Sequence, residues 1–212
     1  MPIYFHKNEQ DYQLGIWRMD ESKEDLRSML ELSQSDLDMY ESFRSEYRKR
    51  EWLTTRVLLK KLLAPAVIVT IEYDMNGKPQ LFDSEFSISI SHTKNFVSVL
   101  LAKYAGAGID LETIQPRIKN ISKKFITRQE EMSLTGNDNL DCMHVIWGTK
   151  EVLFKIYGKG ELNFLENLSA SKFQLKEKGI LKGKIMKDDY KKEYSINYEK
   201  LDNLMLVYAM GN

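Results

Sequence analysis

The segment from Trp147 to Gly160, WGTKEVLFKIYGKG, constrains the fold more than any other part of the chain. Wound as an α-helix, it presents a continuous apolar stripe that is typical of packing against a core. The opposite side carries Trp147 and Phe154, and a purely solvated face does not normally contain such large apolar groups. We therefore expect a helix that is covered on both sides. The apolar stripe consists of Val145, Ile146, Thr149, Val152, Leu153 and Ile156.

Two charged residues, Glu151 and Lys155, lie one helical turn apart on the side that carries the aromatic residues. A surface ion pair is one interpretation, and a place in a functional site is the other. Gly158 and Gly160 flank Lys159 where this helix is expected to end. Glycine at these positions favours a left-handed helix end and close approach of another segment.

Composition limits the class of protein. With 212 residues, the chain can form one large domain or two small ones. Its formal net charge is zero, which does not favour nucleic acid or a membrane surface as a partner. The single cysteine excludes an internal disulfide and fits a reducing compartment. Neither a signal-peptide pattern nor a membrane-spanning apolar run is visible, so we expect a soluble, cytoplasmic protein.

A long basic helix is predicted in the first half, from about Ser35 to Leu63. Most of its charges are interpreted as a solvated face above apolar residues, with Arg50 and Arg56 as exceptions. Further on, Asn76-Gly77 predicts a hairpin turn, and Lys78 follows it directly.

Serines alternate with apolar residues from Phe86 to Ser91, which predicts a strand with one apolar and one polar face. A row of serines indicates a polar cleft rather than ordinary surface. His92 ends the strand, and a lone histidine there is most often structural.

Ile109 to Glu112 is predicted to be a strand, with Asp110 and Glu112 on the same face at a separation of about 6.5–7 Å. Two like charges at this spacing repel unless a cation or hydrogen-bond donors lie between them. A solvated strand edge is the other interpretation. Thr127 and Glu130 form a capping-box pattern. The small residues 105–108 suggest a boundary between two α+β halves, 1–104 and 105–212.

Four motifs occur in order: GKP after the hairpin turn, SISHT, GIDLE, and WGTKEVLFKIYGKG. Together they resemble the 4′-phosphopantetheinyl transferases, in the Sfp-like single-chain branch, over roughly residues 50–160. The resemblance implies two similar ferredoxin-like α+β halves in pseudo-twofold arrangement within a monomer, with the active site in the cleft between them.

The resemblance also implies an activity, that of a holo-[acyl-carrier-protein] synthase type 4′-phosphopantetheinyl transferase. Such an enzyme moves 4′-phosphopantetheine from coenzyme A to a serine of an apo acyl or peptidyl carrier protein, and releases adenosine 3′,5′-bisphosphate. Carriers of fatty-acid, polyketide and nonribosomal peptide biosynthesis all present such a serine.

Residue roles follow from the motif positions. Asp110, Glu112 and Glu151 would hold Mg²⁺, and Glu151 and Lys155 would be catalytic. Mg²⁺ suits an all-oxygen carboxylate site beside substrate phosphates. The proton acceptor is left open between Glu151, a metal-bound water (slightly preferred) and Glu130. Coenzyme A would contact Arg56, Lys78, Ser91, His92, Lys150 and Lys155.

One departure from the family pattern is Gly148, which lies inside the helix and should cost about 1 kcal/mol relative to alanine. Two other functions remain as alternatives. The first is a non-catalytic relative that binds coenzyme A or a carrier protein. The second, a nucleic-acid-binding protein that uses the helix around 44–61, is disfavoured by the zero net charge.

Overall fold

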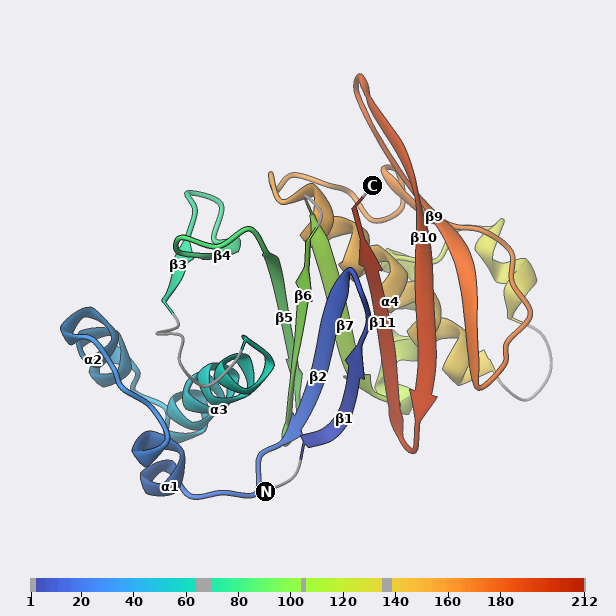
Figure 1. Cartoon of the computed structure of the whole chain (residues 1–212). Coiled ribbons are helices and arrows are strands. Elements are labelled where there is room, and N and C mark those ends of the chain that lie inside the picture. Colours follow the sequence, from blue (N-terminus) through green and yellow to red (C-terminus); the bar gives the residue numbers. More distant parts are fainter. Residues whose placement is uncertain (1–2, 64–69, 104–105, 135–138, 212) are drawn as a thin grey trace.

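The computed structural model describes residues 3–63, 70–103, 106–134 and 139–211. It is a mixed α and β structure with two antiparallel sheets and a small hairpin (Figure 1). The fold class predicted from the sequence is confirmed at this level. No helix in the described ranges is long and apolar enough to cross a membrane.

The first sheet contains four strands in the order β1-β2-β6-β5. Helix α3 packs against β2 and β6 on one face of this sheet. The predicted serine strand is β5, and it forms a hairpin with β6. The strand bounds are β1 Ile3–Asn8, β2 Tyr12–Arg18, β5 Ser87–Thr93 and β6 Phe96–Ala102.

In the described residues between β2 and the small hairpin that starts at Ile71, the chain forms three helices: α1 (Lys23–Ser28), α2 (Gln34–Ser42) and α3 (Glu46–Leu63). The prediction of one helix from Ser35 to Leu63 is therefore wrong. Phe43 ends α2 in an extended conformation, with φ −74° and ψ 123°. Helix α3 then begins at Glu46, and the carbonyl of Ser45, just before it, accepts from the Lys49 amide at 3.0 Å. The break lets α2 fold back across α3.

The second sheet contains five strands in the order β7-β11-β10-β9-β8. Helix α4 (Asn139–Tyr157) lies across β7, β11 and β9 on one face. The small hairpin, β3 (Ile71–Tyr73) with β4 (Pro79–Leu81), contains the predicted Asn76-Gly77 turn. Three 3₁₀ helices connect β7 to α4: Pro116–Asn120, Ser122–Lys124 and Glu130–Ser133. The strands are β7 Ala107–Thr113, β8 Leu168–Ala170, β9 Lys178–Lys187, β10 Tyr190–Leu201 and β11 Leu204–Met210.

Apolar side chains join the two sheets. Leu14 and Leu100 of the first sheet share a buried cluster with Ile109 and Leu206 of the second. Helices α3 and α4 have their own clusters on the other faces, so the paired sheets lie between the two helices (Figure 1).

The edges of the two sheets meet where β5 runs beside β7, and hydroxyl groups complete the contact. Ser89, Ser91 and Thr93 accept hydrogen bonds from the amides of residues 109, 111 and 113, at 3.1, 3.2 and 3.2 Å. We call this set, with Ser87, the hydroxyl seam; Ser87 accepts from the Gly106 amide at 3.2 Å. The serine row therefore lies at a buried junction between sheets. The predicted domain boundary, between residues 104 and 105, falls outside the described residues.

Candidate active site

Helix α4 presents a different set of residues to each side, as predicted. Its apolar stripe belongs to the core of the second sheet. The aromatic side is also covered, because the Trp147 ring lies 5.0 Å from Phe125 and 5.4 Å from Phe164 between ring centroids. Lys155, farther along the helix, reaches the Ile109 carbonyl of β7.

Gly148 allows the close approach of α4 to the sheet. A Cβ atom at this position would lie 2.5 Å from Val207 Cγ2 and 3.5 Å from Asp110 Oδ2. The first distance is shorter than real contacts allow. Gly148 is unfavourable for the helix, but it allows α4 to pack against β7, the strand that carries Asp110 and Glu112.

Asp110 is the buried acid at the centre of the site, with 5% exposure. Its Oδ1 accepts hydrogen bonds from Ser91 Oγ at 3.2 Å and from Lys155 Nζ at 3.1 Å. The Lys155 ammonium also donates to the Ile109 carbonyl at 2.6 Å. Lys155 thus reaches from α4 to β7, which excludes the interpretation that it serves only as a surface partner for Glu151.

Two further carboxylates flank Asp110, and each is half-buried. Burial and the charge of Asp110 raise the pKa of Glu112 to about 7, although Arg117, Lys155 and the Trp147 indole oppose the change. Burial and Asp110 also raise the pKa of Glu151 to about 7, with Lys155 acting in the opposite direction. The structure therefore brings Asp110, Glu112, Glu151 and Lys155 within electrostatic reach of one another.

The chemistry of these carboxylates fits Mg²⁺, since all of their donor atoms are oxygens and a cation would relieve their repulsion. In the described part of the chain, however, no three acidic, histidine or cysteine side chains are already arranged around a common ion position. The ammonium of Lys155 is the cation that Asp110 contacts here.

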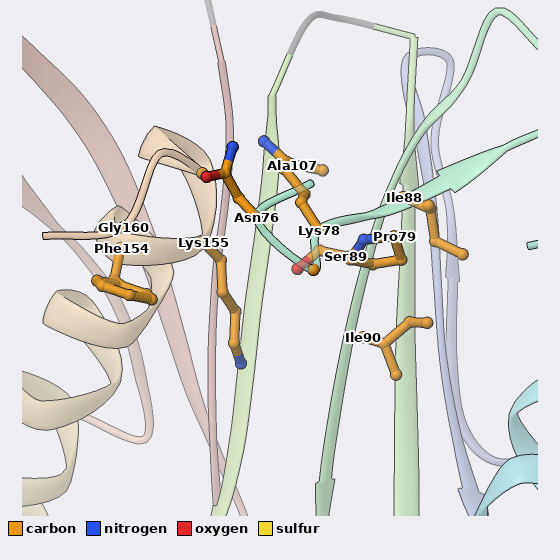
Figure 2. Close-up of a pocket in the computed structure, with 12 residues that line it drawn as sticks. Asn76, Lys78, Pro79, Ile88, Ser89, Ile90, Ala107, Phe154, Lys155 and Gly160 are labelled. Atoms are coloured by element: carbon orange, nitrogen blue, oxygen red, sulfur yellow. The ribbon is translucent and has the colours of Figure 1, made fainter. Parts of the chain in front are cut away.

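A cavity of about 250 Å³ opens beside Lys155. Helix α4 contributes Phe154 and Lys155, and the β3–β4 hairpin contributes Lys78 and Pro79 (Figure 2). The remaining wall consists of Ile88, Ser89 and Ile90 of β5, Ala107 of β7, and Gly158 and Gly160 after α4. Apolar side chains and two ammonium groups therefore line the same space. Such a cavity suits a ligand that has both an apolar part and anionic groups.

Lys78 reaches this cavity over the end of α4. Gly158 has φ +66°, as predicted for the helix end, and its amide donates to the Phe154 carbonyl at 3.0 Å. A Cβ atom on Gly158 would lie 2.7 Å from Lys78 Cδ. Lys78 Nζ donates to the Ile156 carbonyl at 3.2 Å, and burial lowers its pKa. Gly158 thus provides both the helix end and the space for Lys78.

Ser91 and His92 lie at the end of β5 that approaches Asp110. Ser91 is buried, and its hydroxyl donates to Asp110 and accepts from the Leu111 amide. The His92 side chain is 47% exposed. Burial, Arg48 and Lys155 lower the pKa of His92, whereas Glu51 and Asp110 raise it.

Arg56 does not lie with the acidic residues. Its side chain is buried within the first half of the chain, where Nε and Nη2 donate to Asp36 Oδ1 at 3.2 and 3.1 Å. The guanidinium carbon also lies 3.3 Å from the centroid of the Trp52 ring. Through these contacts, the guanidinium holds α2 against α3.

Lys150 is fully buried on the other side of α4. Its ammonium donates to the carbonyls of Phe125 and Phe164 at 2.6 and 2.8 Å, and to Glu130 Oε2 at 2.9 Å. Glu130 completes the predicted capping box with Thr127 and accepts from the Ala170 amide. This arrangement ties the segments around α4 together and keeps both side chains out of the Asp110 cluster.

Glu51 is a residue that the sequence analysis missed. It is buried and faces Arg48 and His92. A signal was available, because Glu51 shares the buried side of its helix with Thr55 and Leu58. A carboxylate in an apolar helical stripe indicates a charged partner.

Comparisons with known proteins find relatives in the same family that the four motifs resemble. No protein-family model matches the chain. Over 117 residues it is 27% identical to the 4′-phosphopantetheinyl transferase AcpT of Escherichia coli O157:H7. It is 29% identical over 118 residues to AcpT of Escherichia coli K12, and 26% identical over 117 residues to that of Salmonella typhimurium. These matches cover 52% of this chain and 59–60% of each relative, so the chain spans about three fifths of the relatives' length.

Proposed function

We propose, from the now confirmed resemblance to the 4′-phosphopantetheinyl transferases, that this chain transfers phosphopantetheine from coenzyme A to a carrier-protein serine. The observation that carries the proposal is the meeting of Asp110, Glu112, Glu151 and Lys155 beside a cavity that also contains Lys78. Each of these side chains comes from one of the motifs on which the resemblance rests.

The reaction requires a serine oxygen to attack a phosphorus of the coenzyme A pyrophosphate. A new serine–phosphate bond forms, the bond to the bridging oxygen breaks, and adenosine 3′,5′-bisphosphate leaves. Negative charge grows on the departing phosphate. Lys155 is well placed to stabilise this charge, because its ammonium is already directed to the acidic strand.

Glu151 is the proposed proton acceptor for the serine hydroxyl. Because a carboxylate that holds Mg²⁺ is a weak base, Glu151 would take the proton through an intervening water rather than directly. Asp110 and Glu112, with Glu151, would hold Mg²⁺, which when bound neutralises pyrophosphate charge. Glu130 is a weaker candidate for the proton acceptor, because Lys150 and Ala170 already occupy its carboxylate.

Lys78 and His92 are proposed to bind the phosphate groups of coenzyme A, and the apolar wall of the cavity to contact its uncharged part. Ser91 would support this site from beneath through Asp110. For Arg56 and Lys150, the observed contacts favour structural roles within the same proposal.

The finer features of the family are also proposed for this chain. They comprise two ferredoxin-like halves, 1–104 and 105–212, in a pseudo-twofold monomer with the active site between them, and a holo-[acyl-carrier-protein] synthase type of activity. A cytoplasmic location follows from an acceptor that belongs to fatty-acid, polyketide or nonribosomal peptide synthesis. The single, buried cysteine is compatible with this location.

The test is incubation of the protein with coenzyme A, Mg²⁺ and a panel of apo acyl and peptidyl carrier proteins, read by intact mass. We expect at least one carrier to gain one phosphopantetheine group on its serine, and a serine-to-alanine carrier to gain none. Binding of coenzyme A without transfer to any carrier would instead support the non-catalytic alternative.

A further inference from the structure

A buried carboxylate on α3 is not used by the proposed chemistry. Glu51 is only 5% exposed, and each of its oxygens faces a nitrogen of another side chain. Oε2 lies 3.1 Å from Arg48 Nη1 in the same helix, and Oε1 lies 3.6 Å from His92 Nε2 on β5. The carboxylate therefore bridges the first half of α3 to the end of the strand that approaches the acidic cluster.

Burial of a carboxylate is unfavourable unless the charge is paired. Arg48 alone would provide a partner within the helix, and an exposed pair of that kind contributes little. The second contact differs, because it joins Glu51 to a residue that is distant in sequence and belongs to another element. Glu51 is thus placed where it can control the His92 ring.

The backbone around His92 is held by the same end of α3. Tyr47, one turn before Glu51, donates its hydroxyl to the Thr93 carbonyl at 3.5 Å and accepts from the Asn95 amide at 3.4 Å. The turn after β5 is therefore held by Tyr47, and the imidazole lies beside Glu51. Two successive turns of one helix define the position of this histidine.

The ring nitrogens of His92 have different surroundings. Nε2 faces Glu51, while Nδ1 has no hydrogen-bond partner among the residues that the structure describes. An acid on one nitrogen orients the ring and leaves the other nitrogen for a ligand. The charged groups that act on the ring are Glu51 and Arg48 from α3, Lys155 from α4 and Asp110 from β7.

We propose that Glu51 is a positioning residue, which orients the His92 imidazole so that Nδ1 faces the phosphate groups of coenzyme A. This inference rests on the proposed function, because it concerns the same coenzyme site. It assigns a role to a residue outside the sequence motifs that carry the resemblance.

The primary test compares coenzyme A affinity by calorimetry for wild type, Glu51→Gln, His92→Ala and the double variant. Glu51→Gln should weaken binding about two- to fivefold, the change expected for loss of a weak electrostatic contact to the ring. The double variant should bind no more weakly than His92→Ala, because Glu51 acts through the ring. Glu41→Gln is the matched control, since Glu41 is exposed and pairs with Lys49 on the surface.

A second measurement follows His92 by NMR in the protein without coenzyme. Glu51→Gln should lower the midpoint of the imidazole titration, whereas Glu41→Gln should leave it unchanged. If Glu51→Gln does not fold, Glu51→Asp keeps the charge but withdraws it by one methylene, and should weaken binding in the same direction.

The results separate this inference from the proposed function. Unchanged affinity in Glu51→Gln, in a protein whose wild type binds coenzyme A, would overturn the inference alone. An additive loss in the double variant would do the same, since it would show that Glu51 acts independently of His92. A wild type that does not bind coenzyme A would reject the coenzyme role of the site and this inference with it, even if the NMR midpoint moves.

Discussion

At the scale of single residues, Lys155 has the most specific assignment. Its ammonium connects α4 to Asp110 and to the backbone of β7. Lys155→Met keeps the alkyl stem and removes the charge that would face the departing phosphate. Loss of one such preorganised contact costs on the order of 3–4 kcal/mol in the transition state. We therefore expect single-turnover transfer to fall by roughly 10²–10³-fold.

Magnesium affinity, measured by calorimetry, should survive in Lys155→Met, because the three carboxylates remain. The matched control is Lys172→Met, which alters an exposed lysine after β8. A wild-type transfer rate in Lys155→Met would return this residue to a structural role.

The raised pKa values of Glu112 and Glu151 predict how stability depends on pH in the metal-free protein. The pKa of each carboxyl group rises from its ordinary value of 4.5 to about 7 in the folded protein. The folded state therefore binds more protons than the unfolded state between these values, and the free energy of unfolding should fall as pH rises from about 4.5 to 7.

Glu151→Gln should reduce this slope and stabilise the protein at pH 8 by on the order of 1–2 kcal/mol, less than the full conversion because the group is partly exposed. Urea unfolding in EDTA across the pH range measures the effect. Glu131→Gln, at an exposed position, is the control. A slope that is identical in Glu151→Gln and wild type would contradict the assignment.

At the scale of elements, the distance between α4 and the second sheet depends on Gly148. Alanine would gain about 1 kcal/mol in helix propensity, but its Cβ would lie 2.5 Å from Val207 Cγ2. Overpacking of this kind costs about 1–3 kcal/mol, so Gly148→Ala should lower the free energy of unfolding. Adding Val207→Ala should recover part of the loss. A more stable Gly148→Ala protein would show that the helix can move away at no cost.

The hydroxyl seam gives a second prediction at this scale. Ser89 accepts from the Ile109 amide, and both residues are buried. Ser89→Ala leaves that amide without an acceptor, which should cost about 1–3 kcal/mol and speed its hydrogen exchange. Ser195→Ala is the comparison, because Ser195 is exposed and accepts only from Lys182. Unchanged exchange at Ile109 would mean that another group satisfies the amide.

The elements also show what the sequence could predict. Periodicity identified the strands around 87–93 and 109–112, and the Asn76-Gly77 turn identified the hairpin, because these signals are local. The break between α2 and α3 was missed, since Phe43 and Ser45 carry no proline or glycine signal. The serine row was expected to face a cleft. Ser89 does line the cavity, but the hydroxyls of the row also join β5 to β7, and a period of two does not identify that partner strand.

The site shows the same division. The motifs indicated Asp110, Glu112, Glu151 and Lys155, and the structure brings these four residues together. Arg56 bonds to Asp36, and Lys150 bonds to Glu130. Because these partners are remote in sequence, the motifs could not show that Arg56 and Lys150 are buried away from the site. Glu51 differs, because its place in a buried helical stripe was a signal that the sequence did carry.

At the scale of the whole molecule, metal dependence should be separable from folding. Asp110 lies where β5, β7 and α4 meet, and within the described ranges its side chain accepts hydrogen bonds from Ser91 and Lys155. Asp110→Ala should therefore abolish transfer while the circular dichroism spectrum stays that of wild type. Excess EDTA should abolish transfer by the wild type as well. Full activity in EDTA would reject the metal assignment.

The hydroxyl seam has a consequence for how the two sheets can change during evolution or design. Within each sheet, neighbouring strands are joined by main-chain groups that almost every amino acid supplies, so a substitution rarely removes a bond. Across the seam, the acceptors are side chains at four positions, 87, 89, 91 and 93. Exchange of serine for alanine, or of threonine for valine, removes the hydrogen bonds of that one position, which at Ser91 include the bond to Asp110. The contact between the two sheets at this seam can therefore be weakened step by step by single substitutions, while the main-chain hydrogen bonds within each sheet remain.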